Sequence, residues 1–187
     1  PDLLMIQPST EHEVKLALDY CVNNNKGSSY IRLVSIPTSI PFSLVSECKL
    51  EKGKGTTIVD GKDCLVFSYG PTMLTEAYHA AKSLADMGIG IKLINLPWLN
   101  HVDLNWLKSQ IAGFNEIVTI DDHYIIGGQG DMILSAISSL NINHRVHCLK
   151  IGVESIPECG TNDEVLAAHK LDSNSLHKRI GSFINSK

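Results

Sequence analysis

The sequence predicts an α/β fold: a mainly parallel five-stranded sheet with one antiparallel edge strand, covered on both faces by helices in three αβα layers. Two observations carry this prediction. From residue 64 onward, short apolar runs alternate with longer segments of helical periodicity, and parallel strands joined by crossover helices are buried on both faces. The run TTIV at residues 56–59 predicts the antiparallel strand at the edge of the sheet.

The first 36 residues read as one helix followed by one strand. Thr10 to Glu13 form a capping-box pattern that begins the helix, and Asn23-Asn24-Asn25 ends it. The strand is SSYIRLVSI, residues 28–36. A helix and a single strand cannot bury both of their faces, so we interpret residues 1–36 as a helix-strand remnant of another α/β domain.

The remaining residues divide into a linker and one larger domain. Residues 37–54 contain Pro37, Pro41 and several serines without a sustained period, which is typical of an interdomain linker. Residues 55–187 begin with two β-rich runs around Asp60-Gly61, a pattern that predicts a hairpin. The expected elements after the turn are strand 64–69, helix 72–87 ended by Gly88, strand 89–96, helix 103–112, strand 116–120, helix 130–140, strand 146–151 and a helical tail from Asn162.

Composition excludes several classes of function. Sixteen Lys and Arg against twenty Asp and Glu give a net charge of -4, so the basic surface that nucleic-acid binding requires is missing. No apolar run reaches the ~20 residues of a membrane span. The five cysteines form no CxxC pair, which argues against a disulfide framework or a zinc site and favours the cytoplasm. The chain starts at Pro1, and we expect a fragment, a processed product or a cloning boundary.

The segment IVTIDDHYIIGGQG, residues 117–130, allows two interpretations. Glycines between a strand and a helix can cradle a phosphate on backbone amides. However, the run lacks the third glycine of a dinucleotide site and the Lys-Ser/Thr of a P-loop. Asp131 also places a negative charge in the first helical turn, where it would repel an anion. We therefore predict that these glycines serve close packing of the helix on the strand.

Two further groups of residues are candidates for a site. Asp122 and His123 follow the strand at the edge where open α/β sheets place their sites, and acid-base chemistry is one reading. Because adjacent strand residues point to opposite faces, we favour a hydrogen-bonding role at an interface. Arg32 ends an otherwise apolar strand, so its charge must reach water, a carboxylate or an anionic ligand. It is the candidate substrate-binding residue, with an interdomain salt bridge as the equal alternative.

Taken together, these segments resemble the C-terminal region of transketolases. The similarity runs in order through PSTEHEVKLALDYCVNNNKGSSYIR at 8–32, CLVFSYGPTMLTEAYHAAKSLADMGIGIKLINL at 64–96, VDLNWL at 102–107, VTIDDHYIIGGQG at 118–130 and LKIGV at 149–153. Similar domains occur in deoxyxylulose-phosphate synthases and in the β subunits of pyruvate-type dehydrogenases. The His123-Tyr124 pair favours transketolase.

The resemblance implies which domains this chain contains and which functions lie outside it. Residues 1–36 match the end of the pyrimidine-binding domain and residues 55–187 match the transketolase C-terminal domain. Thiamine diphosphate and magnesium belong to the parent enzyme, and we expect this chain alone to bind no cofactor or metal and to contain no catalytic residue. Asp122, His123, Gly127 and Gly128 are then expected at a domain or dimer interface.

The resemblance also implies partners and a substrate class. The expected partners are the missing N-terminal part of the same enzyme, or a partner subunit, in a homodimer that transfers a two-carbon ketol unit between sugars. Transketolases typically have a second arginine, which grips the sugar phosphate, at the position of Ser35, so a bidentate phosphate contact is lost here. The alternative is a non-catalytic C-terminal subunit or binding module of a split transketolase, a deoxyxylulose-phosphate synthase or a 2-oxoacid-dehydrogenase-like complex.

Overall fold

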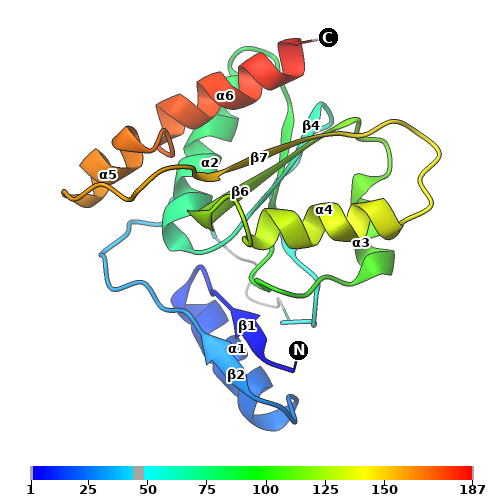
Figure 1. The fold of residues 1–187 in the computed structure, drawn as a ribbon, viewed down its shortest axis with the longest axis vertical. Helices are drawn as coiled ribbons and strands as arrows, with labels where there is room; N and C mark the ends of the chain where they lie inside the picture. Colours follow the sequence, from blue (N-terminus) through cyan, green and yellow to red (C-terminus); the bar gives the residue numbers. More distant parts are fainter. Residues whose placement is uncertain (1, 44–48, 187) are drawn as a thin grey trace.

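The computed structural model describes residues 2–43 and 49–186. Within these residues the strands form a two-stranded sheet near the N-terminus and a five-stranded sheet. Figure 1 shows the small sheet and its helix at one end of the molecule, below the larger sheet and its covering helices. The candidate site lies where the two sheets meet.

The N-terminal unit consists of β1 (Leu4–Ile6), α1 (Glu11–Asn23) and β2 (Ser29–Ile31). The helix begins as predicted, because Thr10 Oγ1 accepts from the Glu13 amide at 3.1 Å. Strand β1 was not predicted; it pairs in parallel with β2. The predicted strand 28–36 ends early, at Ile31, and Leu33 beyond it is 63% exposed.

The five-stranded sheet has the order β3-β5-β4-β6-β7. Its strands are β3 (Thr56–Val59), β4 (Cys64–Ser68), β5 (Ile91–Asn95), β6 (Glu116–Tyr124) and β7 (His147–Val153). All neighbours are parallel except β3, which runs antiparallel to β5 at the edge. This arrangement confirms the predicted mainly parallel sheet with one antiparallel edge strand.

The predicted hairpin around Asp60-Gly61 is wrong. Strand β3 pairs with β5, and β5 lies between β3 and β4. The link between β3 and β4 therefore passes over the start of β5, where Asp63 accepts from the Gly90 amide at 2.6 Å and donates its own amide to the Gly90 carbonyl at 2.8 Å. A Cβ at Gly61 would lie 2.5 Å from the Gly90 backbone, so only a glycine lets the link pass this close to the start of β5.

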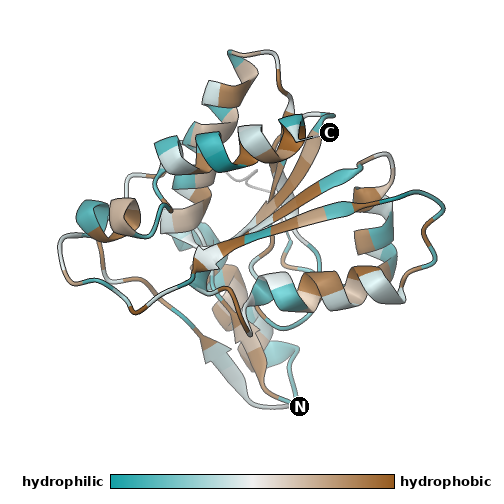
Figure 2. Cartoon of the chain, turned by 45° about the horizontal axis from the view of Figure 1, so that its top comes forward, coloured by the Kyte–Doolittle hydropathy of each residue, from teal (hydrophilic) through white to brown (hydrophobic). Residues whose placement is uncertain are grey.

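Helices cover both faces of the sheet, as the three-layer prediction requires. One face carries α2 (Pro71–Ala85), α5 (Asn162–Ala168) and α6 (Ser173–Asn185), and the other carries α3 (Leu104–Ile111) and α4 (Gln129–Ser139). Strand β4 shows the division: Cys64 and Val66 belong to the first core, and Leu65 and Phe67 to the second. Figure 2 shows the resulting apolar strands with hydrophilic residues on the outer faces of the helices.

The N-terminal unit shares the second core. Leu4, Ile6 and Ala17 are buried in the same cluster as Phe67 and Trp98 of the larger domain. On its other edge β1 also bonds to the segment after β5, through Gln7 N to Pro97 O at 2.8 Å and Leu99 N to Met5 O at 2.9 Å. The predicted division into 1–36, 37–54 and 55–187 stays a prediction, since one core joins the first and last of these ranges.

Two other elements differ from expectation. Strand β6 continues to Tyr124, four residues beyond the predicted end, with an irregularity in its pairing to β7 between Ile120 and Tyr124. The helical tail from Asn162 is two helices, because Lys170 has a positive φ of 57° between them. None of the described helices is long and apolar enough to cross a membrane.

Candidate functional site

Polar side chains gather at the carboxyl ends of β4 and β6, where residues 2–32 meet the sheet. Asp121 is buried at this edge, and its carboxylate is enclosed by donors. Its Oδ1 accepts from the Gln129 amide at 2.6 Å and the Tyr69 hydroxyl at 3.0 Å, and its Oδ2 accepts from the Gly130 amide at 2.9 Å. An internal carboxylate thus occupies the anion position at the N-terminus of α4.

The glycines before and within α4 make room for this carboxylate. A Cβ at Gly128 would lie 2.8 Å from the Asp121 carboxyl carbon, and one at Gly130 would lie 2.5 Å from Thr119 Oγ1. Neither position accepts a larger side chain without movement. This geometry confirms for Gly128 and Gly130 the prediction of close packing of helix on strand, whereas Gly127 serves a turn with a φ of 76° and packs against nothing in the described residues. Asp121 leaves the amides of Gln129 and Gly130 no room for an external phosphate.

Burial and hydrogen bonding act on Asp121 in opposite directions. Burial raises the pKa of Asp121, and the bonds from Gly130, Tyr69 and Gln129 lower it in part. Burial likewise raises the pKa of Tyr69, and the Asp121 charge adds to that rise. The tyrosine therefore stays a hydrogen-bond donor to the carboxylate throughout the physiological range.

A second carboxylate, that of Asp131, bonds to the loop that precedes α4. Asp131 accepts from the Gly127 amide at 2.7 Å and pairs with Lys150, which also bonds the Ile125 carbonyl at 3.1 Å. These bonds lower the pKa of Asp131, with Lys150 the largest cause. The sequence predicts that Asp131 repels an anion. In the structure Asp131 also accepts from the Gly127 amide, so that amide has a partner within the chain.

Arg32 lies at the end of β2 and reaches across to β6. Its Nη1 donates to the Asp122 carbonyl at 2.8 Å and to Gln7 Oε1 at 3.0 Å, and its Nη2 lies 3.3 Å from Asp122 Oδ2. The arginine and aspartate side chains remain 34% and 31% exposed. The salt bridge that was the alternative reading is therefore present, and part of the guanidinium still faces solvent.

His123 and Gly127 lie on the solvent side of this edge. The His123 Nδ1 is 3.0 Å from the Tyr124 carbonyl, and the two rings meet edge to face with centroids 6.1 Å apart. Gly127 has a φ of 76° with no atom within 4 Å of a built Cβ. Of the four predicted interface residues, these two face outward, whereas Asp122 and Gly128 contact the chain itself.

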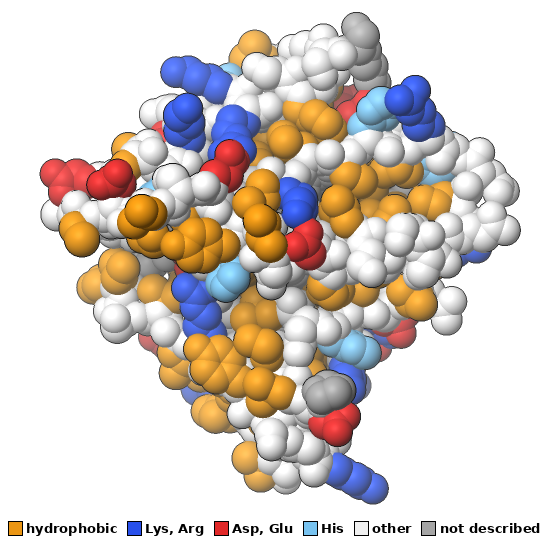
Figure 3. Space-filling model, viewed as in Figure 1, with side chains coloured by type: hydrophobic (Ala, Val, Ile, Leu, Met, Phe, Trp, Pro, Cys, Tyr) orange, Lys and Arg blue, Asp and Glu red, His pale blue; other side chains and the backbone are white. Residues whose placement is uncertain are grey.

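A cavity of about 540 Å³ opens beside Arg32 and His123. Its wall is mostly apolar and includes Leu3, Met5, Tyr30 and Leu99. Leu3 and Tyr30 are 43% and 46% exposed. Figure 3 shows this face, where hydrophobic side chains gather over β1 and β2 next to a basic side chain and a histidine.

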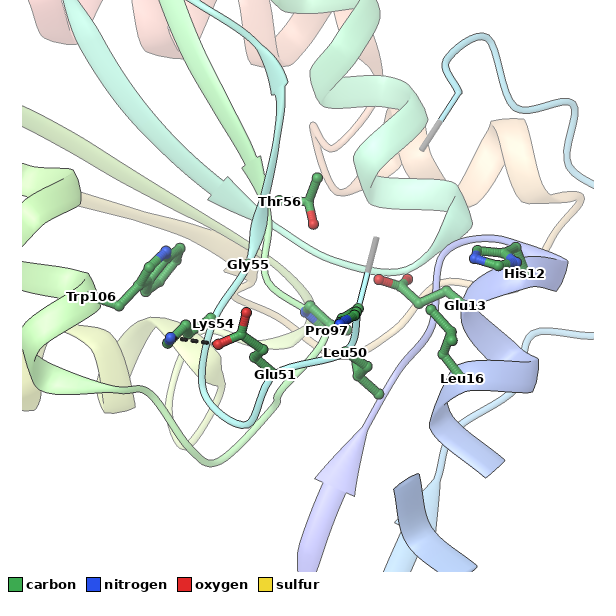
Figure 4. Close-up of a pocket in the computed structure, with 11 residues that line it drawn as sticks. His12, Glu13, Leu16, Leu50, Glu51, Lys54, Gly55, Thr56, Pro97 and Trp106 are labelled. Carbon is green, nitrogen blue, oxygen red and sulfur yellow. Dashed lines mark hydrogen bonds and ion pairs between the residues drawn. The ribbon is translucent and has the colours of Figure 1, made fainter. Parts of the chain in front are cut away.

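A second cavity, of about 370 Å³, lies between α1 and the segment before β3. Figure 4 shows Glu13 and Leu16 on one side and the Lys54–Glu51 pair on the other. The Glu13 carboxylate is buried and satisfied, since it accepts from the Ser9 amide at 2.6 Å and from Asn95 Nδ2 at 2.9 Å. Burial raises the pKa of Glu13. Glu13 is satisfied by Ser9 and Asn95, and Lys54 pairs with Glu51, so this cavity is a weaker site.

The family model for the transketolase C-terminal domain matches residues 53–176. This chain belongs to the transketolase C-terminal domain family. The match begins just before β3 and ends within α6. It therefore includes Asp121, His123 and the α4 loop, and it leaves Arg32 and Gln7 in the preceding segment.

Individual relatives extend the similarity over nearly the whole chain. A putative transketolase C-terminal section from Methanocaldococcus jannaschii is 29% identical over 181 residues, covering 96% of this chain and 55% of the relative. A 1-deoxy-D-xylulose-5-phosphate synthase from Mannheimia succiniciproducens is 27% identical over 187 residues, covering 98% of this chain and 28% of that enzyme. The chain thus spans about half or less of these relatives.

Solved structures show the same fold. A split gene transketolase, described as an inactive beta4 tetramer, matches with a TM-score of 0.84 at 22% identity and covers 99% of this chain and 58% of that chain. A Pichia stipitis transketolase mutant matches with a TM-score of 0.72 at 15% identity, over 99% of this chain and 25% of the other. In both, residues 2–32 and the family domain align together.

The residues of this family domain do not fit thiamine diphosphate or its metal. Within residues 2–43 and 49–186, no group of three or more His, Cys, Asp and Glu side chains could hold a metal ion. The helix N-terminus that would suit a diphosphate is filled by Asp121. The amides at the start of α4 are therefore used by the chain's own carboxylate.

Sequence reasoning missed three site residues: Gln7, Tyr69 and Glu13. Gln7 had a usable signal, because it is a polar residue at the end of an apolar run and precedes a proline, much as Arg32 ends its own strand. Tyr69 and Glu13 looked like ordinary strand-end and helix residues. Only their three-dimensional partners, Asp121 and Asn95, reveal their roles.

Proposed function

We propose that this chain is the C-terminal part of a thiamine-diphosphate-dependent, transketolase-like enzyme that transfers a two-carbon ketol unit between sugars. The main support for the proposal is a contrast within the chain: the five-stranded family domain is covered, whereas the small sheet of β1 and β2 has an exposed face. The five-stranded domain is covered on both faces, whereas β1 and β2 form a parallel pair with Leu3 and Tyr30 exposed. Parallel sheets are normally buried on both faces.

In this proposal the missing part of the enzyme covers the exposed face of the small sheet. The cofactor supplies the carbanion chemistry that cleaves the ketose, and residues outside this chain hold it, because no described residues here suit it. A homodimer then places His123 and Gly127 at a contact with a neighbouring domain or subunit. Asp122 and Gly128 support that contact from within, through Arg32 and Asp121.

Arg32 is the substrate-binding residue in this proposal. Its guanidinium borders the apolar cavity, and its position is set by Gln7 and Asp122. A cationic group at a cavity mouth suits the phosphate of a sugar phosphate. In this proposal the chain alone is not catalytic, because the Asp121 carboxylate and the N-terminus of α4 bond to one another.

The test is reconstitution. The 187-residue chain is co-expressed with the preceding region of the same enzyme, and the purified complex is supplied with thiamine diphosphate, magnesium, a ketose phosphate and an aldose phosphate. Mass spectrometry should detect sugars longer and shorter by two carbons with the complex and none with the chain alone. A complex that forms and binds cofactor but transfers no two-carbon unit would contradict ketol transfer.

A second function is favoured by the names of several relatives. Several of the relatives that this chain matches are 1-deoxy-D-xylulose-5-phosphate synthases. The same complex is therefore supplied with pyruvate and glyceraldehyde 3-phosphate. Formation of 1-deoxyxylulose 5-phosphate with loss of carbon dioxide would assign the chain to this alternative.

A further inference from the structure

The contacts of Arg32 divide into two kinds. Nη1 bonds two neutral acceptors, the Asp122 carbonyl at 2.8 Å and Gln7 Oε1 at 3.0 Å. Nη2 has the charged contact, and it is long, at 3.3 Å from Asp122 Oδ2. Charge-assisted N–H···O bonds are normally about 2.7–2.9 Å. One side of the guanidinium is therefore firmly held by neutral oxygens, and the other is loosely paired.

The two neutral acceptors of Nη1, Gln7 Oε1 and the Asp122 carbonyl, are held in place by the fold. Gln7 is 1% exposed, and its amide donates to the Pro97 carbonyl at 2.8 Å. Its side chain lies against Gly70, which has a φ of 71° and at which a Cβ would lie 2.3 Å from Gln7 Nε2. The Asp122 carbonyl belongs to strand β6. Neither acceptor can leave Arg32 without moving the backbone or a buried side chain.

The contact between Arg32 Nη2 and the Asp122 carboxylate can be replaced by another anion. Arg32 and Asp122 keep 34% and 31% of their side chains exposed, so solvent and solutes reach this part-buried pair. Of the two partners, Arg32 lines the apolar cavity and Asp122 does not. A phosphate oxygen that approached from the cavity could replace Asp122 Oδ2 on Nη2 while both bonds to Nη1 remained.

We propose that the Asp122 carboxylate is an internal counter-ion that occupies Nη2 of Arg32 until a substrate phosphate displaces it, while Gln7 and the Asp122 carbonyl position the guanidinium. The inference rests on the proposed substrate-binding role of Arg32. Asp122 and Gln7 are positioning residues in this scheme, with opposite effects on phosphate affinity. Gln7 favours binding because it orients the donor, and Asp122 opposes binding because it competes for the donor.

The experiment titrates the whole 187-residue chain with inorganic phosphate, ribose 5-phosphate and neutral ribose, and follows the Arg32 side-chain Nε–H by NMR. Asp122→Asn should bind both phosphates about three- to tenfold more tightly than the wild-type chain, and Gln7→Met should bind them more weakly. Arg32→Gln removes this NMR probe together with the donor, so its phosphate binding is measured by isothermal titration calorimetry beside the wild-type chain, and it should be lost. The matched control is Glu154→Gln, which removes the carboxylate of another arginine pair, Arg179–Glu154 at 2.7 Å, and should change nothing.

Each outcome decides the inference. Unchanged or weaker phosphate binding by Asp122→Asn, or no binding by any variant up to 50-fold excess over about 1 mM protein, would overturn it. Should that variant unfold, Asp122→Ser removes the same charge and gives the same comparison. A response to ribose 5-phosphate but not to inorganic phosphate identifies the sugar phosphate as the ligand, and the reverse identifies the free anion. The titration needs no turnover, so a failure of ketol transfer in the reconstituted complex is a separate result.

Discussion

Replacing Gly130 by alanine tests the packing of α4 on the sheet. A Cβ at residue 130 would lie 2.5 Å from Thr119 Oγ1 and 3.0 Å from Asp121 Oδ2, whereas ordinary contact begins at 3.4 Å. Thr119 is buried in the strand below, so the helix has to move by about 0.9 Å. That movement stretches the amide bonds to Asp121, now 2.6 and 2.9 Å long.

The expected net loss is about 1.5–5 kcal/mol. Overpacking costs about 1–3 kcal/mol, and weakening a buried bond to a charged group costs about 1.5–3 kcal/mol. Alanine recovers about 1 kcal/mol over glycine in a helix. At about 2–4 °C per kcal/mol for a chain of this length, the melting temperature should fall by roughly 3–20 °C.

Urea and thermal denaturation of the whole chain measure this change, with Gly181→Ala as the matched control. Gly181 is also a helical glycine, in α6, and its nearest neighbour is Leu84 Cδ2 at 3.5 Å, so alanine should stabilise by about 0.5–1 kcal/mol. Adding Thr119→Ala to Gly130→Ala removes the closest contact and should restore at least ~1 kcal/mol through coupling between the two sites. A Gly130→Ala chain as stable as the wild type would contradict the close packing of α4 on Thr119.

Two further predictions concern the same edge of the sheet. Gly70→Ala should destabilise the chain by about 1–3 kcal/mol, because the residue has a φ of 71° and its Cβ would meet Gln7; urea denaturation measures it, and a loss below ~0.5 kcal/mol would argue against a fixed Gln7. The pKa of Asp121 is raised above its ordinary 3.8 by burial, so the folded state binds the extra proton and the free energy of unfolding falls as pH rises from about 4 through the folded pKa. Asp121→Asn should flatten this slope in urea titrations between pH 4 and 7, and an unchanged slope would contradict it.

The sequence predicted the α4 loop correctly as packing and not as a phosphate site. The missing third glycine and the charge of Asp131 were sufficient for that conclusion. They could not show that Asp121 takes the place of the anion, because Asp121 and Gly130 meet only when the strand and the helix turn back on one another. For Arg32 the sequence left a ligand and a salt bridge as equal readings, and the structure contains the salt bridge with part of the arginine still exposed.

The order and type of most helices and strands follow from local signals in the sequence. The spacing of apolar residues, the glycines after helices and the capping residues act over a few neighbours, so the alternation of strands and helices could be predicted. Which strands pair and which polar groups meet depends on the folded chain. Asp60-Gly61 has the local chemistry of a hairpin, yet β3 gains its hydrogen bonds from β5. Arg32, Gln7 and Asp122 come together from three distant segments for the same reason, since pairing across a sheet depends on the fold of the whole chain and not on neighbours in sequence.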